Sequence, residues 1–571
     1  MYKPVRPRPK KTNIVRSRNG CKRCRERKTK CDEQKPSCET CTRLGRDCEP
    51  VSQNLRFKVV SGLALRDSSP KRDAESFYTT AGEEISQERL DISSMRITNL
   101  DLIRPLQHTD RDVFYSTYWE DVCLPAVHPM FQSISLTAWG DAMFKDAILA
   151  LSSCNLSRIK PDQRGLLNMN LGAFSPNVVH QTRSQAYYSS AIRRFVSLNN
   201  LDLRSRPEIV FAVLVLFAYI ESSMGNFHGF QCHVEGLTRF LVELQESMND
   251  AVYKALLTAW MQVRFVVWWA RAYFSTMDVH RMLPSIPLPD IIAGYSESIQ
   301  GRRVSVLSIM CESHRLNSTE VLSHWVALAE GAQSINQGHT MPDTRGIAIL
   351  QLAEEAKKLN EWLFHLPSSE QPLQLDLSDS NSILPHTAPV RFQSHDAALN
   401  FAYYVVARIM QCSGLFLQLN VPDFSRSRPS CTEERVWVEL LVRVAKGVNL
   451  KDAISKNSYT IGFSSLMLAA ILRCNSLSLG IEIENWLETL RSLHPTEEGA
   501  FPVYQTLGVV RAVNQQRMAG CEIFGVTLPV DDAGGKPKFT AYNSQSISPL
   551  LLHGKCLVSG ELFTQCASID L

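Results

Sequence analysis

Residues 21–48 read CKRCRERKTKCDEQKPSCETCTRLGRDC and place six cysteines within 28 positions of a 571-residue chain. Their spacing, C-x2-C-x6-C-x6-C-x2-C-x6-C, is one C-x2-C-x6-C unit written twice, with DEQKPS joining the copies. A C-x2-C pair at the start of a helix can direct two thiolates at one cation, and a third cysteine further along the chain adds another ligand. The repeat therefore predicts a metal clamp built from two related halves.

Six thiolates fall short of the eight bonds that two tetrahedral zinc ions require. The shortfall closes if two sulfurs bridge both metals, and the pseudo-twofold relation between the halves makes Cys21 and Cys38 the natural bridging pair. We therefore expect zinc as a structural cofactor, two ions per chain, with the metal ligands Cys21, Cys24, Cys31, Cys38, Cys41 and Cys48.

Other uses of these thiols fit less well. The N-terminal residues MYKPVRPRPKKTN are basic and lack an apolar segment, so we expect no secretory signal and a reducing compartment, in which disulfides are not expected. A thioredoxin-type C-x2-C needs a surrounding βαβ pattern, which is absent, and an iron–sulfur cluster would leave two thiols idle. Zinc knuckles and RING-like modules need histidine or eight ligands, and residues 1–50 hold no histidine.

Positive charge is concentrated in the same part of the chain. Residues 1–50 hold 16 Lys/Arg against 6 Asp/Glu, whereas the remainder holds 45 against 51. The two halves of the cluster are also unequal, with side-chain charges of +5 in CKRCRERKTKC and 0 in CETCTRLGRDC. A purely structural module does not need this asymmetry. It indicates that the short helix expected in the first half, roughly residues 22–29, faces DNA phosphates and bases.

The stretch from Gly20 to Cys48 resembles the DNA-binding module of fungal zinc-cluster (two-zinc, six-cysteine) transcription factors. The resemblance rests on all six cysteines, the Arg-x-Arg-Lys-x-Lys run and the proline of the linking loop. It implies that the first and fourth cysteines bridge the metals and that Lys28 reads a CGG triplet in the major groove. Glu26 departs from a uniformly basic helix. The remaining expected DNA contacts, mostly to phosphates, are Arg27, Arg25, Lys30, Arg23 and Lys22.

The chain is expected to divide into five parts: a basic arm (1–18), which carries the import-like run PRPKK, the zinc-cluster domain (19–50), a flexible linker (51–107), an all-helical regulatory domain (108–530) and a partly disordered C-terminal tail (531–571). The linker shows no sustained heptads, so no coiled coil is expected there. YSTYWEDVCLPAVHP, FKDAILALSS and HVEGLTRFL resemble, more weakly, the fungal-specific regulatory domain, which implies effector binding or partner contacts.

The fold class expected is mostly α, with two short helices in the zinc module and a large all-α multi-helix domain. We expect Thr109 and Ser394 to cap helices. Two buried helix faces are predicted, one of Leu256, Trp260, Val263 and Val267, and one of Leu399, Ala402, Tyr403, Val406 and Met410. Further helices are expected near residues 141–156, 183–199, 207–223, 228–246, 345–365, 432–447, 463–478 and 503–523.

The body offers little catalytic chemistry, because no Gly-rich phosphate loop and no nucleophile elbow appear in it. His228, His233 and Glu235 do not share one helical face, so we expect satisfied polar residues rather than a metal site. The ten remaining cysteines are expected mostly in the core, with a redox sensor among them as the less favoured alternative. The apolar run at 209–220 is too short to cross a bilayer and predicts a buried helix.

The sequence thus predicts a nuclear, sequence-specific DNA-binding transcription factor for RNA polymerase II genes, with control of a metabolic or secondary-metabolite pathway as a candidate role, and not an enzyme. Expected partners are double-stranded DNA with CGG-type sites and the transcription machinery or co-regulators, while a homodimer stays open and no membrane is involved. Two alternatives stay open as well: a co-regulator that uses the zinc module for protein contacts, and an enzyme with a nucleic-acid docking head.

Overall fold

The computed structural model divides into two compact units, Met1–Asn99 and Leu100–Leu571, and each is described here by itself. In the first unit the structure describes residues 21, 23, 24, 29, 31, 32, 34 and 37–48. In the second it describes residues 108–159, 176–224, 227–273, 275–292, 297–331, 344–373, 388–412, 414, 416, 419, 432–499, 501–529 and 550–567. The linker predicted at 51–107 lies outside the described residues.

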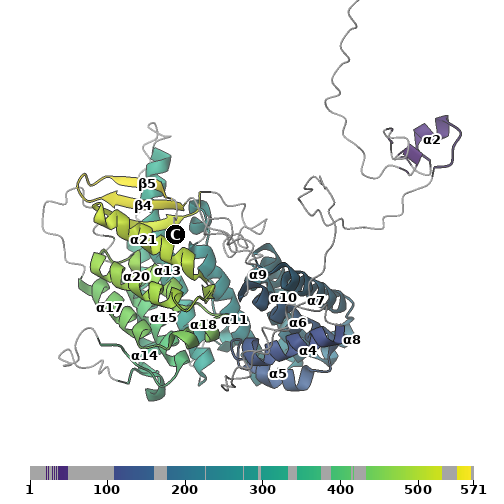
Figure 1. The fold of residues 1–571 in the computed structure, drawn as a ribbon, viewed down its shortest axis with the longest axis horizontal. Helices are drawn as coiled ribbons and strands as arrows, with labels where there is room; N and C mark the ends of the chain where they lie inside the picture. The colour runs from purple at the N-terminus through teal and green to yellow at the C-terminus, as the bar shows by residue number, and fades with distance from the viewer. Residues whose placement is uncertain are drawn as a thin grey trace, which may run out of the picture. The chain divides into compact units, whose positions relative to one another are not determined.

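Helices make up most of the second unit, which confirms the mostly α fold class (Figure 1). Its N-terminal part contains α4 (His108–Tyr118), a π-helical turn (Trp119–Cys123), α5 (Met130–Ala138), α6 (Ala142–Ile159), α7 (Val178–Val196), α8 (Asn200–Ser205), α9 (Pro207–Met224) and α10 (Phe227–Ser247). The chain continues through α11 (Asp250–Tyr273), α12 (Met277–Arg281), α13 (Ile299–Gly331), α14 (Thr344–Phe364) and α15 (His395–Gln411). It then forms α17 (Thr432–Lys446), α18 (Leu450–Lys456), α19 (Phe463–Ile471), α20 (Leu477–Arg491) and α21 (Val503–Met518).

Side-chain caps fix where several of these helices begin. Ser394 accepts a hydrogen bond from the backbone N–H of Ala397 (3.1 Å) at the start of α15, which confirms the predicted cap. Asn199 and Asp202 form a reciprocal capping box at α8. The cap predicted at Thr109 is wrong, because α4 already begins at His108 and Thr109 lies inside it.

The predicted buried faces of α11 and α15 are confirmed, but both helices are buried over more than one face. Residues 397–407 of α15 are buried without a break, because α13, α14, α17 and α19 pack around that helix. Helix α9 is similar: by length and composition it is long and apolar enough to cross a membrane, yet 72% of it is buried inside the body, as is typical of a core helix. Its bounds agree with the helix expected near residues 207–223.

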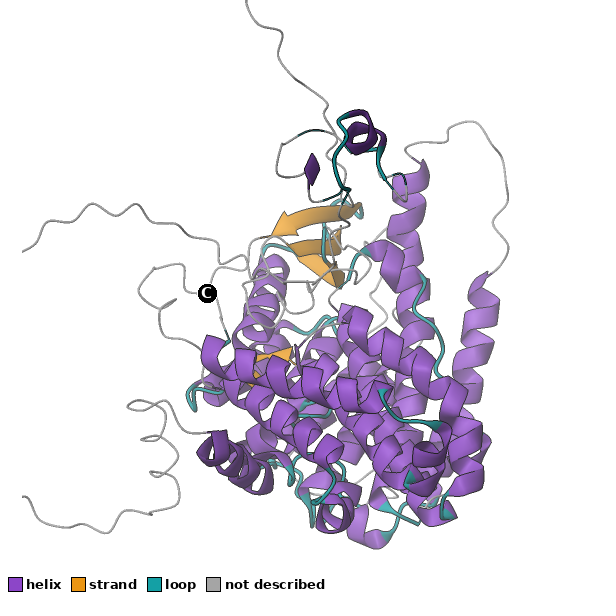
Figure 2. Cartoon of the chain, turned by 90° about the vertical axis from the view of Figure 1, so that its right-hand side faces the viewer, coloured by secondary structure: helices purple, strands orange, loops and turns teal. Residues whose placement is uncertain are grey.

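The structure contains a small sheet in a region for which the sequence predicts the end of a helix (503–523) and a partly disordered tail (531–571). The antiparallel strands β3 (Cys521–Thr527), β4 (Leu550–Cys556) and β5 (Leu562–Ala567) form one sheet in the order β3-β4-β5, at one end of the helical body (Figure 2). Helix α21 therefore ends at Met518 and not near residue 523. Gly520, at φ +80°, lets the chain turn directly from the helix into β3. A second, minimal hairpin pairs β1 (Glu497–Glu498) with β2 (Phe501–Pro502).

The sheet is held by packing against the C-terminal half of α13. Trp325 donates its indole N–H to the carbonyl of Phe563 (2.9 Å), and its ring centroid lies 5.7 Å from that of Phe524. Gly525 sits at an irregularity in the β3–β4 register, where a Cβ would come within 2.6 Å of the Leu322 side chain. The absence of a side chain there allows the close approach of strand and helix. These apolar contacts explain why residues of the predicted tail are ordered as strands.

Candidate metal centre

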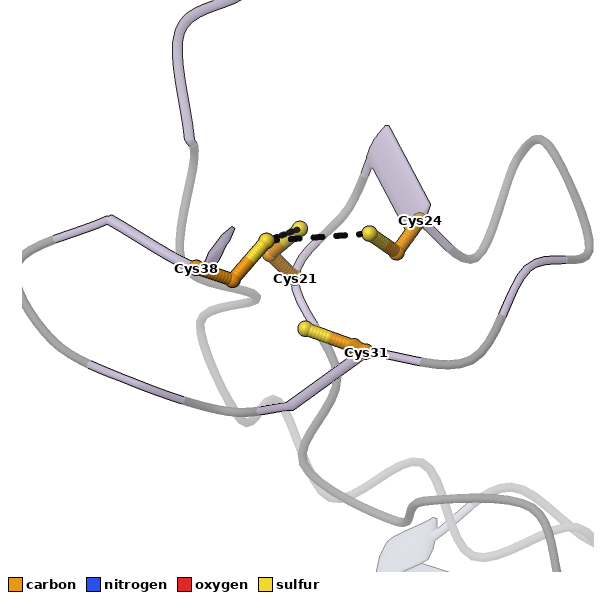
Figure 3. Close-up of side chains that lie close together, drawn as sticks. All are labelled: Cys21, Cys24, Cys31 and Cys38. Atoms are coloured by element: carbon orange, nitrogen blue, oxygen red, sulfur yellow. Dashed lines mark hydrogen bonds between the residues drawn. The ribbon is translucent and has the colours of Figure 1, made fainter. Parts of the chain in front are cut away.

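The six cysteines of the first unit bring their sulfurs into two overlapping groups of four. One group is Cys21, Cys24, Cys31 and Cys38, and the other is Cys21, Cys38, Cys41 and Cys48. Within each group all sulfurs lie within 4.8 Å of one another. Both groups share Cys21 and Cys38, the pair that ligand arithmetic singles out as bridging. Figure 3 shows the first group, with the sulfurs of Cys21, Cys24 and Cys38 close to one another.

Local backbone structure positions the second half of the cluster. Helix α2 (Glu39–Arg43) begins directly after Cys38, whose carbonyl accepts from the backbone N–H groups of Cys41 (2.9 Å) and Thr42 (3.0 Å). This turn brings Cys41 to the same side as Cys38, as a C-x2-C pair at a helix start requires. From the linking loop, Asp32 accepts from the backbone N–H of Glu39 (3.0 Å) and so satisfies a free donor at the helix N-terminus.

The donor set fits zinc. The sulfur–sulfur distances are 3.8 Å for Cys21–Cys38, 3.6 Å for Cys21–Cys41 and 3.7 Å for Cys24–Cys38. A tetrahedral site with Zn–S bonds of about 2.3 Å places its sulfurs about 3.8 Å apart, whereas a disulfide needs about 2.05 Å. All six cysteines are free, and all except Cys48 are buried. The arrangement therefore suits metal thiolates and not disulfides.

Crowding of the sulfurs shifts their pKa values in opposite directions. Burial would raise the pKa of Cys21, but hydrogen bonds from the Cys24 backbone and from the thiols of Cys24, Cys41 and Cys38 lower it to about 6. For Cys38 a backbone hydrogen bond from Cys41 lowers the pKa, whereas burial and the surrounding thiols raise it well above the usual range. Several negatively charged thiolates cannot lie this close together unless a cation compensates their repulsion. A bound divalent metal ion provides that positive charge.

The predicted DNA-contacting residues lie mostly outside the described part of the chain. Arg23 is described and is exposed, in a helical turn that includes Cys24. The carbonyl of Cys24 accepts from the backbone N–H of Thr29 (3.0 Å). Outside the described residues lie Lys22, Arg25, Arg27, Lys28 and Lys30, together with Glu26 and Pro36.

In the body, His233 and its neighbours form a polar hydrogen-bond network. Tyr188 hydrogen-bonds the Nε2 atom of His233 (2.6 Å) and the carboxylate of Glu221 (2.5 Å). Glu235 accepts from Gln231 on its own helix (3.4 Å), and the side chain of His228 lies outside the described residues. Among the described residues, the groups with metal-binding geometry are the two cysteine sets alone. The interpretation as ordinary polar residues therefore holds for His233 and Glu235.

The other cysteines divide into two classes. Cys154, Cys412 and Cys474 are buried as expected, but Cys232 is exposed on α10, so the core interpretation is wrong for that residue. Three cysteines of the sheet are also partly or fully exposed: Cys521, Cys556 and Cys566. Trp268 and Trp269 lie in the core, with the indole N–H of Trp268 donated to the carbonyl of Pro284 (2.9 Å).

A cavity of about 610 Å³ lies between residues 285–288, α13 and α14, and neither Trp268 nor Trp269 lines it. Its apolar lining includes Ile286, Leu288, Ile309 and Trp362. Its polar lining includes Glu312, which is held in a two-bond ion pair with Arg315, and Glu355, which accepts from Lys358 (2.6 Å). Burial raises the pKa of Glu355 even though Lys358 opposes the shift. The cavity is thus lined by both apolar and charged side chains, as small-molecule sites are.

Comparison with known proteins bears directly on the cysteine cluster. Residues 19–57 match the family described as the fungal Zn(2)-Cys(6) binuclear cluster domain. Regulatory protein CAT8 of Saccharomyces cerevisiae is 32% identical over 118 residues, which are 20% of this chain and 8% of that protein. Sterol uptake control protein 2 of Candida albicans is 49% identical over 87 residues, or 14% of this chain and 12% of its own length.

A longer match reaches into the helical body. The aspercryptin biosynthesis cluster-specific transcription regulator atnN of Emericella nidulans is 26% identical over 258 residues, which are 40% of this chain and 35% of that protein. The chain thus spans between 8% and 35% of the length of these three relatives. No solved structure matches it. The family and these relatives are regulators and not enzymes, in line with the absence of catalytic motifs. The two overlapping four-sulfur groups and the match at residues 19–57 show that this part of the chain is a fungal Zn(2)-Cys(6) binuclear cluster domain, and the chain is similar to known transcription regulators.

Proposed function

We propose that this chain is a nuclear, sequence-specific DNA-binding regulator of RNA polymerase II genes that reads CGG-type triplets through its zinc cluster. The observation that carries the proposal is the pair of four-sulfur groups that share Cys21 and Cys38, directly beside the concentration of basic residues. A metal-fixed scaffold next to positive charge is suited to holding a short segment against a polyanion.

Two zinc ions per chain, held by the six cysteines, supply the folding free energy of a module too small to build a hydrophobic core of its own. The zinc-bound cysteine module is proposed to hold the basic residues between Cys24 and Cys31 in position to contact DNA. Lys28 is proposed to donate to the guanine acceptors of the triplet, while Arg25, Arg27 and Lys30 hold phosphates. Lys22 and Arg23 are proposed as further DNA contacts.

The remaining residues are proposed to form a linker and a regulatory body. The cavity beside α13 and α14 supports an effector-binding role, because it joins apolar and charged groups in one concave site. The name of the Emericella nidulans relative, a regulator specific to a biosynthesis cluster, supports control of a secondary-metabolite pathway. Co-regulators or the transcription machinery, and a second copy of the chain, are the proposed protein partners.

Binding of the full-length, zinc-loaded chain to a labelled duplex with a CGG triplet tests the proposal. We expect a specific affinity that falls steeply as salt rises, because phosphate contacts release counterions. Lys28→Ala is expected to lose about 1–3 kcal/mol of discrimination between CGG and a mutated triplet. As the matched control, Arg25→Ala should weaken binding to both duplexes alike and reduce the salt slope by about one.

An alternative function is a co-regulator that uses the zinc module for protein contacts. The charge difference of +5 against 0 between the two halves counts against it, since a protein-binding module has no need of that asymmetry. Absence of both a salt slope and a triplet preference in the full-length chain would favour this alternative and overturn the proposal.

A further inference from the structure

The outer end of the β3–β4 ladder places two thiols face to face. Cys521 is the first residue of β3 and Cys556 is the last residue of β4, and the strand register pairs them directly. Both are half-buried, so a small reagent can reach them from solvent.

The position of this pair in the ladder favours a covalent bond. The backbone N–H of Leu557 donates to the carbonyl of Gly520 (3.0 Å), so the hydrogen-bonded pair is the neighbouring one. Cys521 and Cys556 therefore occupy a non-hydrogen-bonded site, where the Cα atoms of opposite residues lie about 4.5 Å apart and the side chains approach most closely. A disulfide needs a Cα separation of about 4.4–6.8 Å, so the two sulfurs can join without moving the strands.

The two thiols are not equivalent. Cys556 opens the β4–β5 turn, where the hydroxyl of Ser559 and the backbone N–H groups of Ser559 and Val558 hydrogen-bond its sulfur and lower its pKa. Gly560, at φ +74°, closes this turn by donating to the carbonyl of Cys556 (2.9 Å). Burial and the neighbouring charge of Cys556 raise the pKa of Cys521. Cys556 is thus the more readily ionised thiol, and the strand register places Cys521 directly opposite it.

Other described cysteines of the body lack this combination. Cys123, Cys154 and Cys311 are buried, and burial raises the pKa of each. Cys566 is exposed on β5, but its register partner is Leu551. Cys566 therefore offers a matched control, since it is an accessible thiol in the same sheet with no cysteine opposite.

We propose that Cys556 and Cys521 form a thiol-oxidation site at which a hydroperoxide converts the two thiols into a cross-strand disulfide. The Cys556 thiolate attacks the terminal oxygen of the hydroperoxide, the O–O bond breaks, and the other oxygen leaves as alkoxide, or as hydroxide when the oxidant is hydrogen peroxide, so that sulfur is oxidised to sulfenic acid and the peroxide is reduced. The Cys521 sulfur then attacks the Cys556 sulfur, the S–OH bond breaks, and water leaves with the Cys521 proton.

The bridge would act on the junction between α21 and the sheet. Gly520 links the end of α21 to β3, and Arg517 on the last turn of α21 forms a buried ion pair with Glu522 (2.8 Å). A bond at Cys521 thus fixes β4 to the end of α21 and closes a chain loop from residue 521 to residue 556. Closing a loop of this length removes conformational freedom from the unfolded chain. Oxidation is therefore expected to make this junction more resistant to unfolding.

Limited oxidation of the full-length, zinc-loaded protein tests the site. The protein is treated with hydrogen peroxide in equimolar amount, alkylated, digested and analysed by mass spectrometry. We expect a linked peptide pair that contains Cys521 and Cys556, while Cys566 stays alkylated. In Cys521→Ser, a 1,3-dione probe should label Cys556 as a trapped sulfenic acid, whereas in Cys556→Ser the probe should leave Cys521 unlabelled.

Cys566→Ser, the matched control, should form the linked pair at the wild-type rate. The proposal is overturned if Cys521 and Cys556 remain fully alkylated after treatment, or if Cys566 is oxidised as fast as Cys556. Equal probe labelling of Cys521 in Cys556→Ser would overturn the assignment of Cys556 as the attacking thiol. The wild-type measurement needs no substitution, so it stands even where a variant folds poorly.

Discussion

Cys38→Ser is the most informative single substitution in the metal centre, because Cys38 belongs to both four-sulfur groups. Serine has nearly the same shape, but its hydroxyl stays protonated at neutral pH and is a poor zinc ligand. Cys48 offers the matched control, since it belongs to one group only. If each ligand contributes equally to its site, Cys38→Ser removes two metal–sulfur bonds and Cys48→Ser removes one.

The size of the effect follows from the free energy of structural zinc binding, about 10–16 kcal/mol per site, or roughly 3 kcal/mol for each of four ligands. Cys48→Ser should therefore weaken one site about a hundredfold and leave the other intact. Cys38→Ser should weaken both sites about a hundredfold each, a total of about 6 kcal/mol, and unfold the module. Native mass spectrometry and competition with a chromogenic chelator measure zinc number and affinity in the full-length protein.

We expect two zinc ions per chain in the wild type, one tightly held ion in Cys48→Ser, and none in Cys38→Ser under the same chelator concentration. Two retained ions in Cys38→Ser would refute the shared-ligand assignment. Equal losses in both variants would show instead that the two sites fill as one unit, and would contradict the additive reasoning.

The body supports further predictions. Arg473 is buried and hydrogen-bonds Asn317 (2.6 Å) and the carbonyl of Phe524 (2.8 Å), so Arg473→Ala should cost about 3–5 kcal/mol in urea unfolding by stranding these acceptors. The buried carboxylate of Glu498 accepts from the backbone N–H groups of Phe463 (3.0 Å) and Ser464 (2.7 Å). Glu498→Gln should cost about 2–4 kcal/mol in the same assay, because an amide N–H₂ then faces one of these donors; an unchanged midpoint would contradict this role. Burial, with the charges of nearby His553, Arg473 and Arg271, lowers the pKa of His280 to about 3. Between about pH 3 and about pH 6.5 the unfolded state binds more protons at His280 than the folded state does. The contribution of neutral His280 to the free energy of unfolding is therefore complete above about pH 6.5. Below about pH 6.5 it falls by up to about 1.4 kcal/mol per pH unit. His280→Leu should therefore flatten the stability profile between pH 6.5 and pH 4; an unchanged slope would assign acid sensitivity to other groups.

The sequence predicted a helical body because apolar residues recur at helical spacing, and this spacing can be recognised within a short segment of the chain. The same patterns predicted the buried face of α11 and the cap at Ser394, since capping involves residues three positions apart. They did not predict the sheet. Strand β4 is buried because it pairs with β3 and packs on a body made by earlier helices, and no local pattern records such distant partners.

In the metal centre, the spacing of the six cysteines pointed to both the metal class and the shared pair, because ligand count is a property of composition. The role of Asp32 at the start of α2 was missed, since it depends on how the linking loop returns to the helix. A capping residue is ordinarily sought next to the helix it caps, whereas Asp32 lies seven positions before its partner.

The sequence by itself determined the cysteine-cluster domain, the zinc ligands to test and the concentration of basic residues, because each depends on the spacing of residues close together in the chain. Only the tertiary structure decided which cysteines of the body meet. Cys521 and Cys556 are 35 positions apart, and nothing local distinguishes them from Cys566. Strand register brings the first two together and leaves the third opposite Leu551. Register depends on packing between the sheet and α13, a long-range interaction that no segment of the sequence contains alone.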